Sequence, residues 1–168
     1  MHDPHLTGPA GPVASTLRVR HHDGPTQDPG VRVLDVPEDM ADPLRCPTGQ
    51  VLALTEGMDP SDVVVFVPQT ATAADVGEFL WLIRDLPTTV AVAASARPVT
   101  DALKRVRGST VAGGVDRAGL RRVVLPAAVR MAALRAALDR ADHSIRPLRD
   151  IARSEQVPIH LIQRVGSS

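Results

Sequence analysis

Cationic side chains that could bind an anion are concentrated in one stretch of the chain. Its five arginines are Arg117, Arg121, Arg122, Arg130 and Arg135. A guanidinium donates paired hydrogen bonds to phosphate or carboxylate oxygens, so several on one face could hold a nucleotide. The whole chain carries 19 Lys+Arg and 19 Asp+Glu, a net charge of zero, which argues against nonspecific nucleic-acid binding.

Histidine and cysteine are the other residue types with potential chemistry. His2, His5, His21 and His22 could chelate a transition metal if they folded together, but nothing in the sequence places them in one geometry. A solvated tail is the better interpretation, and we expect no metal site. Cys46 has no visible catalytic partner, so we expect a spectator thiol.

Composition excludes further classes of function. The aromatic residues are Phe66, Phe79 and Trp81, too few for a base-stacking surface, so we expect no nucleic-acid partner. No apolar run approaches membrane-spanning length, and we expect no membrane partner. The single cysteine and the absence of an export signal at the start of this sequence indicate a cytoplasmic protein.

The first sixty residues differ in character from the rest. They hold most of the prolines, which interrupt helices and strand ladders repeatedly. We expect residues 1–30 to form a disordered tail and residues 31–168 to form a single α/β domain. Two short apolar segments, residues 31–36 and 50–54, are candidate edge strands.

From Asp62 onward, strand and helix patterns alternate, which favours a sheet between layers of helices. Residues 63–67 form a continuous β-branched run typical of a buried strand. Thr72 and Asp75 have the spacing of a capping box and predict that a helix begins there. The other expected strands are 89–93, 120–125 (ended by Pro126) and 157–162, and the other expected helices are 101–106, 127–141 and 148–155.

Two motifs in the second half carry a family resemblance. Residues 97–106 read RPVTDALKRV and residues 114–120 read GVDRAGL. They resemble the "PVTDTxKRV" and "TVDRxxL" stretches of the 2-C-methyl-D-erythritol 4-phosphate cytidylyltransferases. The resemblance extends over residues 62–164.

The resemblance implies a Rossmann-like nucleotidyltransferase sheet flanked by helices, here incomplete and with an irregular N-terminal tail. It also implies transfer of a cytidylyl group from CTP to methylerythritol phosphate, supported by Mg²⁺, in isoprenoid precursor synthesis. In the family, the arginine that matches Arg117 reaches from an arm into the partner subunit's substrate site. The matched substrate-binding candidates are Thr100, Asp101, Lys104, Asp116, Arg117 and Arg130.

Other parts that the family uses to hold a triphosphate are missing. Residues 1–60 contain no glycine-rich loop between a strand and a helix. The family's "HDAARP" loop reads VPQTAT at residues 67–72, which places Pro68 at the metal-associated aspartate and Ala71 at the arginine. The later "TDD" reads Arg146, Pro147 and Leu148. We therefore expect no catalytic residues, no cofactor and a degenerate homologue that acts as a binding or partner module.

Other readings of the same residues remain open. An active, divergent transferase completed by a partner chain would need CTP and Mg²⁺, and a purely structural remnant would be marginally stable. Asp101 could simply cap a helix, and Gly113 with Gly114 could form a turn. Retention of Arg117 favours a homodimer through an arm at residues 105–122 over substrate binding.

Overall fold

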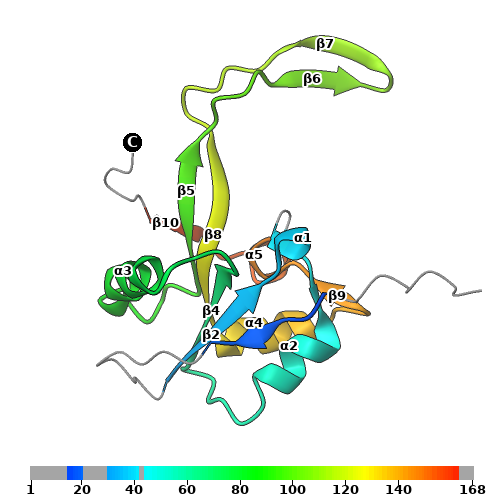
Figure 1. Cartoon of the computed structure of the whole chain (residues 1–168). Helices are drawn as coiled ribbons and strands as arrows, with labels where there is room; N and C mark the ends of the chain where they lie inside the picture. Colours follow the sequence, from blue (N-terminus) through cyan, green and yellow to red (C-terminus); the bar gives the residue numbers. More distant parts are fainter. Residues whose placement is uncertain (1–14, 21–29, 42–43, 163–168) are drawn as a thin grey trace, which may run out of the picture.

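The β-branched run after Asp62 forms strand β4 (Val63–Pro68) inside a six-stranded sheet (Figure 1). The structure is a computed structural model that describes residues 15–20, 30–41 and 44–162. The sheet has the order β1-β2-β4-β8-β5-β10. Its strands are β1 (Arg18–Val19), β2 (Val31–Val36), β4, β5 (Val92–Pro98), β8 (Arg121–Arg130) and β10 (Ile159–Ile162). The predicted α/β class is confirmed.

Strand direction determines which loops share an edge of the sheet. β2 runs parallel to β4, and β5 runs parallel to β10. β8 lies between β4 and β5 and is antiparallel to both. The carboxyl ends of β2, β4, β5 and β10 therefore meet at one edge, where ligands bind in open α/β sheets.

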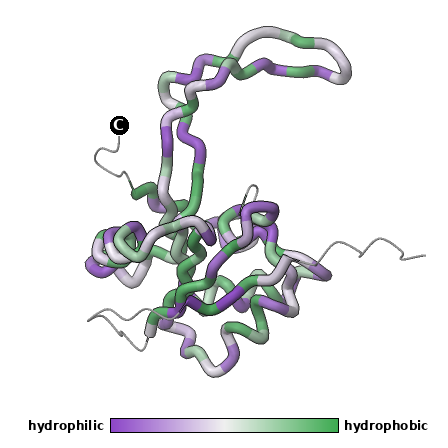
Figure 2. The backbone as a smooth tube through the Cα atoms, in the orientation of Figure 1, coloured by the Kyte–Doolittle hydropathy of each residue, from purple (hydrophilic) through white to green (hydrophobic). Residues whose placement is uncertain are grey.

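Helices cover both faces of the sheet, as the alternating pattern predicts. Helix α3 (Ala73–Arg84) packs on one face, where Phe79 and Val76 are fully buried. The helices α2 (Thr48–Leu54), α4 (Met131–Leu138) and α5 (Pro147–Ser154) lie on the other. Their core includes Leu134 and Ile151. Hydrophobic residues are concentrated in the central strands between these layers (Figure 2).

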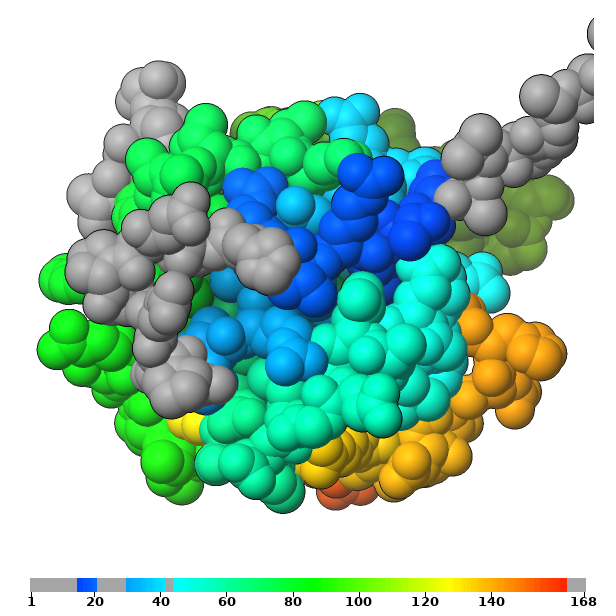
Figure 3. Space-filling view, turned by 60° about the horizontal axis from the view of Figure 1, so that its bottom comes forward, coloured from blue at the N-terminus to red at the C-terminus, as the bar shows by residue number. Residues whose placement is uncertain are grey.

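The N-terminal part of the chain contributes more structure than the sequence predicted. Residues 15–20 of the predicted tail include β1, which pairs antiparallel with β2, and the N–H of Leu17 donates to Gln50 Oε1 at 2.9 Å. Figure 3 shows this segment against α2 on one face of the molecule. β2 is consequently an interior strand, which corrects the expected edge position of residues 31–36. Residues 1–14 and 21–29, and with them the four histidines of the tail, lie outside the described residues.

The segment between β2 and β4 is helical where a strand was expected. Helix α1 (Glu38–Ala41) follows β2, and residues 50–54 belong to α2 and not to an edge strand. Val51 is fully buried, and Thr55 Oγ1 donates back to its carbonyl at 2.7 Å. An apolar run of five residues has too little periodicity to distinguish the two structures. A small ribbon, β3 (Cys46–Pro47) with β9 (Ser144–Ile145), flanks this helix.

Strand β8 continues through Pro126, where the sequence predicted its end. The register between β5 and β8 shifts between Ala94 and Ser95, and Pro126 lies in the unpaired part of β8 opposite this bulge. A proline costs no ladder hydrogen bond at a bulge. Because β8 extends to Arg130, α4 begins at Met131 and not at residue 127.

A long hairpin, here called the arm, projects from the carboxyl edge (Figure 1). It consists of β6 (Lys104–Arg107) and β7 (Thr110–Gly114), which replaces the helix predicted over residues 101–106. No apolar side chain of either strand is buried, so no helix face is stabilised there. Gly108, with φ of 59°, supplies the turn, whereas Gly113 lies at a bulge in β7.

Within the described ranges, no helix is long and apolar enough to cross a membrane.

Candidate functional site

The loop that follows β4 lies at the carboxyl edge and connects to α3. It begins after Pro68 and ends at Thr72, the residue that caps the helix. Pro68 has neither a carboxylate to bind a metal nor an N–H to bind an anion. Among the polar groups of this loop are the backbone carbonyls of Gln69 and Ala71.

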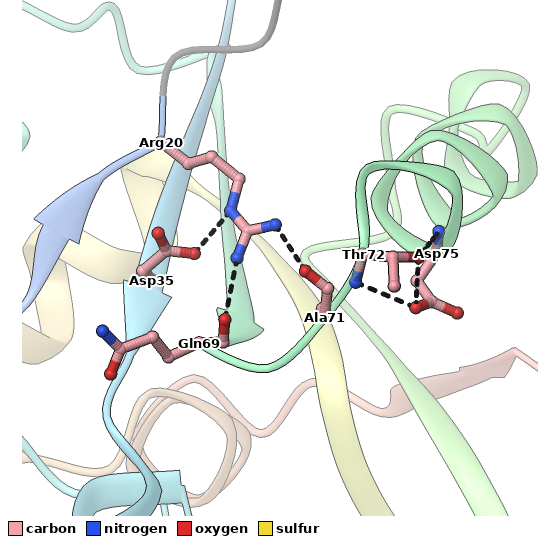
Figure 4. Close-up of polar contacts among 6 residues, drawn as sticks. All are labelled: Arg20, Asp35, Gln69, Ala71, Thr72 and Asp75. Carbon is pink, nitrogen blue, oxygen red and sulfur yellow. Dashed lines mark hydrogen bonds and ion pairs between the residues drawn. The ribbon is translucent and has the colours of Figure 1, made fainter.

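Those carbonyls are occupied by Arg20, which follows β1 (Figure 4). One terminal nitrogen of its guanidinium donates to Ala71 O at 2.6 Å, and the other donates to Gln69 O at 3.3 Å. Its Nε donates to Asp35 Oδ1 at 2.6 Å. Both side chains of the Arg20–Asp35 ion pair are about one-fifth exposed, so water screens the pair only partly. We call this arrangement the Arg20 latch.

The N-terminus of α3 is closed by its own capping box, which confirms the predicted role of Thr72 and Asp75. Asp75 N–H donates to Thr72 Oγ1 at 3.2 Å, and Thr72 N–H donates to Asp75 Oδ2 at 3.0 Å. The Thr72 hydroxyl also donates to Asp75 Oδ2 at 2.7 Å (Figure 4). The Asp75 carboxylate therefore neutralises the positive end of the helix dipole, where a phosphate would otherwise be favoured.

The loop after β2 is acidic. β2 lies beside β4 and is followed by the helix α1, but the connection between them is not the glycine-rich loop that the family resemblance would require. The connection is Pro37, and α1 begins with Glu38 and Asp39. No glycine occurs between Gly30 and Gly49. Without glycine the backbone is not shaped to surround a phosphate, and the two carboxylates repel one.

The base of the arm brings four of the six predicted site residues together. Arg117 donates to the backbone carbonyl of Thr100, and Arg122 pairs with Asp101 at 3.2 Å. Asp101 is thus an ion-pair partner and caps no helix. Asp116 Oδ1 accepts from the N–H of Ala118 at 3.0 Å, which fixes a turn. These contacts are exposed and hold the loops at the base of the arm.

The other two predicted residues lie apart. Lys104 begins β6 opposite Gly114 on the exposed arm. Arg130 ends β8 at the opposite edge of the sheet and donates to three backbone carbonyls, those of Val90 at 3.0 Å, Ser61 at 3.3 Å and Pro87 at 3.3 Å. Its observed role is to join the start of β4 to the segment before β5.

Comparison with protein families matches residues 50–157 to 2-C-methyl-D-erythritol 4-phosphate cytidylyltransferase. The match covers more than half of the chain. The chain belongs to this family. The resemblance at residues 97–106 and 114–120 is thereby confirmed, and the matched range includes the arm, β8, α4 and α5.

Solved structures of the cytidylyltransferase family share the fold. The enzyme from Anaerococcus prevotii superposes with a TM-score of 0.52 at 11% identity, covering 69% of this chain and 54% of its own. The enzyme from Francisella tularensis superposes with a TM-score of 0.51 at 11% sequence identity, and the superposition covers 68% of this chain and 55% of the Francisella chain. This chain thus spans little more than half of either relative. Comparison with curated proteins gave no match.

The residues at the carboxyl edge do not fit the magnesium nucleotide that the cytidylyltransferase family implies. In the resemblance, Pro68 takes the position of the metal-associated aspartate, and the Arg20 guanidinium places a positive charge on the carbonyls of Gln69 and Ala71. A divalent cation would be repelled there. In the described part of the chain, no group of three or more His, Cys, Asp or Glu side chains could hold a metal ion.

Cys46 contributes no reactive group. The side chain is fully buried in the core beneath α2, and burial raises its pKa to about 12. A thiol in this state is protonated at neutral pH and is a poor nucleophile. The structure agrees with the prediction of a spectator thiol.

Sequence reasoning missed an open groove of about 460 Å³ between β8 and α5. Residues of β8 and α1 form two sides of it, and α5 forms a third. Arg146, Arg149 and Arg153 line the α5 side. Arg149 and Arg153 are four residues apart and so lie on one face of the helix, and Arg146 is the residue that precedes it. That spacing is visible in the sequence and could have indicated a basic helix face.

Proposed function

We propose that this member of the cytidylyltransferase family has lost cytidylyl transfer and acts as a noncatalytic binding or partner module. The Arg20 latch is the observation that carries the proposal. In the family resemblance, the loop after β4 is the metal-associated loop. Here Pro68 replaces the aspartate, and a guanidinium satisfies the carbonyls that remain.

Charge at the neighbouring loop supports the same proposal. Transfer to the α-phosphorus of CTP needs cationic groups and amide donors near several anionic oxygens. The described edge has Glu38 and Asp39 after β2 and Asp75 at the start of α3, and its cation Arg20 is already engaged by Asp35 and two backbone carbonyls. Loss of one such stabilising donor typically lowers kcat about 100- to 1,000-fold, and several are absent together.

The test is release of pyrophosphate from CTP, methylerythritol phosphate and Mg²⁺. We expect no release above the background without protein, and no magnesium-dependent heat on titration with CTP. The Francisella tularensis enzyme, assayed in parallel, serves as the positive control. Magnesium-dependent release by this chain would contradict the proposal and favour a divergent transferase.

We also propose that the arm forms a homodimer. Val106 and Val111 are paired across β6 and β7, and each is 57% exposed. Two neighbouring apolar side chains on an exposed ribbon suit a symmetric contact with a second copy.

Sedimentation velocity tests the dimer. We expect the double variant Val106→Glu/Val111→Glu to be monomeric at concentrations at which the parent chain is dimeric. The matched control is Trp81→Gln on α3, which removes a 68% exposed side chain far from the arm and should leave the dimer intact. A monomeric parent chain would refute the proposal.

A further inference from the structure

The groove beside α5 combines an apolar floor with a row of cations. β8 contributes Val123, Val124 and Leu125 to its floor, and Leu148 of α5 and Ile159 of β10 add to the wall. Val123 is 36% exposed, whereas the lower half of the same strand is buried. The groove therefore leaves part of β8 uncovered although the sheet is covered elsewhere on this face.

The three arginines of the groove have no anionic partner in the part of the chain that the structure describes. Neither a hydrogen bond nor an ion pair engages the guanidinium of Arg146, Arg149 or Arg153 there. The carboxylate of Asp150, on the same helix, accepts from the backbone N–H of Arg146 at 2.7 Å. Arg149 and Arg153 are exposed and lie one turn apart on the same helix face.

Volume and chemistry together restrict what the groove could hold. About 460 Å³ lies within the range of ~300–1,000 Å³ typical of small-molecule sites. The lining contains no aromatic ring to stack on a base, so a nucleoside gains little. A bare inorganic anion would leave the apolar floor exposed and would meet only solvent-screened arginines.

We propose that the groove binds an amphipathic monoester phosphate, with its phosphate on Arg149 and Arg153 and its aliphatic chain on Val123, Leu125 and Leu148. This assignment rests on the proposed noncatalytic function and names the ligand class of such a module. The arginines attract the anionic phosphate, and the uncovered apolar side chains of β8 favour contact with the ligand's aliphatic part. Arg146, at the base of the row, is positioned to add a third donor.

Calorimetric titration of the whole chain with octyl phosphate tests the ligand. We expect saturable binding with one site, at least about tenfold tighter than that of inorganic phosphate or 1-octanol, because each of those supplies only one of the two contacts. Binding should weaken as salt is raised from 50 to 300 mM, an interval chosen because ions screen exposed arginines. Equal affinity for octyl phosphate and 1-octanol would overturn the proposal.

Two variants locate the site. Arg149→Gln and Arg153→Gln should each weaken octyl phosphate binding about 5- to 10-fold, the loss expected for a partly solvated charged hydrogen bond. No hydrogen bond or ion pair holds either guanidinium in the described part of the chain, so the melting temperature should change little. The control Arg84→Gln alters an exposed arginine on α3, on the other face of the sheet, and should bind normally. Unchanged binding in both groove variants would exclude this site.

Other occupants give different results. One alternative probe is a helical peptide with glutamates at positions i, i+4 and i+7. If this peptide binds and octyl phosphate does not, the groove binds a protein partner and the proposed ligand class is wrong. If Arg149→Gln made a dimeric chain monomeric, the groove would be an interface between copies. If octyl phosphate does not bind and CTP is not turned over, this inference is refuted and the proposed function stands. If CTP is turned over, the proposed function is refuted.

Discussion

At the scale of single residues, the Arg20 latch is the polar contact with the largest expected effect on stability. Arg20 joins Asp35 of β2 to two carbonyls of the loop after β4. We predict that Arg20→Met lowers the free energy of unfolding by about 2 kcal/mol, because it leaves a mostly buried carboxylate and two carbonyls without their donor. Urea unfolding followed by circular dichroism measures this.

A cycle of variants separates the ion pair from the carbonyl contacts. Arg20→Met combined with Asp35→Asn should cost less than the sum of the two single changes by about 1 kcal/mol. The exposed pair Arg84–Asp85, whose side chains are 69% and 86% exposed, is the control, and Arg84→Gln should change stability by under ~0.5 kcal/mol. If the costs of the two single changes simply add in the double variant, the ion pair contributes nothing to the free energy of unfolding.

The buried thiol of Cys46 should make the free energy of unfolding depend on pH in alkaline solution. Burial raises the pKa of the folded thiol from 9.0 to about 12, so above pH 9 the unfolded chain loses this proton first. Stability is then fully present below pH 9 and falls by about 1.4 kcal/mol per pH unit until the folded thiol titrates. Lys104 is the only lysine and tyrosine is absent, so few other groups titrate in this interval. Unfolding in urea between pH 8 and 10.5 checks the slope.

The variant Cys46→Ala isolates this effect. It should be less stable than the parent at pH 8, because it leaves a small cavity, yet its stability should decline less between pH 9 and 10.5. Parallel curves for the two proteins would exclude the thiol as the cause.

Residue types alone predicted local contacts better than distant ones. Thr72 and Asp75 are three positions apart, and their capping box follows from spacing. Arg20 meets Ala71 across 51 positions, and no local pattern in the sequence brings these two residues together. Arg130 is a second example. The family resemblance predicted that it binds substrate, but in the fold its guanidinium donates to three backbone carbonyls.

At the scale of elements, prediction succeeded where burial gave a long, regular pattern. β4 and α3 follow from a β-branched run and an amphipathic repeat. α2 did not, because a short apolar run fits either a helix or a strand. The arm did not, because no buried apolar face stabilises a helix over residues 101–106. The end of β8 was wrong for a different reason. Pro126 is tolerated where the partner strand shifts register, and that shift is a property of β5 and β8 together.

The arm gives a prediction at this scale. Every residue of β6 and β7 is exposed, so the hairpin adds no buried apolar area to the core. We predict that replacing residues 101–118 by a short Gly-Ser linker shifts the melting temperature of the monomer by less than ~4 °C, about 1 kcal/mol for a domain of this size. Calorimetry at a concentration at which the parent is monomeric measures this shift. A larger loss would mean that the arm supports the ends of β5 and β8.

At the scale of the whole molecule, two cores share one sheet, and their coupling determines whether the chain unfolds as one unit. Phe79 of α3 belongs to the core on one face and Leu134 of α4 to the core on the other. Both pack against β4 and β8, whose side chains alternate between the faces, so neither core can persist once the strands separate. The chain should therefore unfold in a single cooperative transition.

Substitutions in each core test this coupling. Phe79→Ala and Leu134→Ala should each lower the free energy of unfolding by about 3–4 kcal/mol, since each leaves a cavity among fully buried neighbours. In each variant, circular dichroism and hydrogen exchange of β2, β4 and β8 amides should report the same midpoint, lowered equally on both faces. If Phe79→Ala released only α3 while the amides beneath α4 kept the parent's protection, the two layers would be independent. A structural remnant with no cooperative core would show no sharp midpoint even in the parent chain.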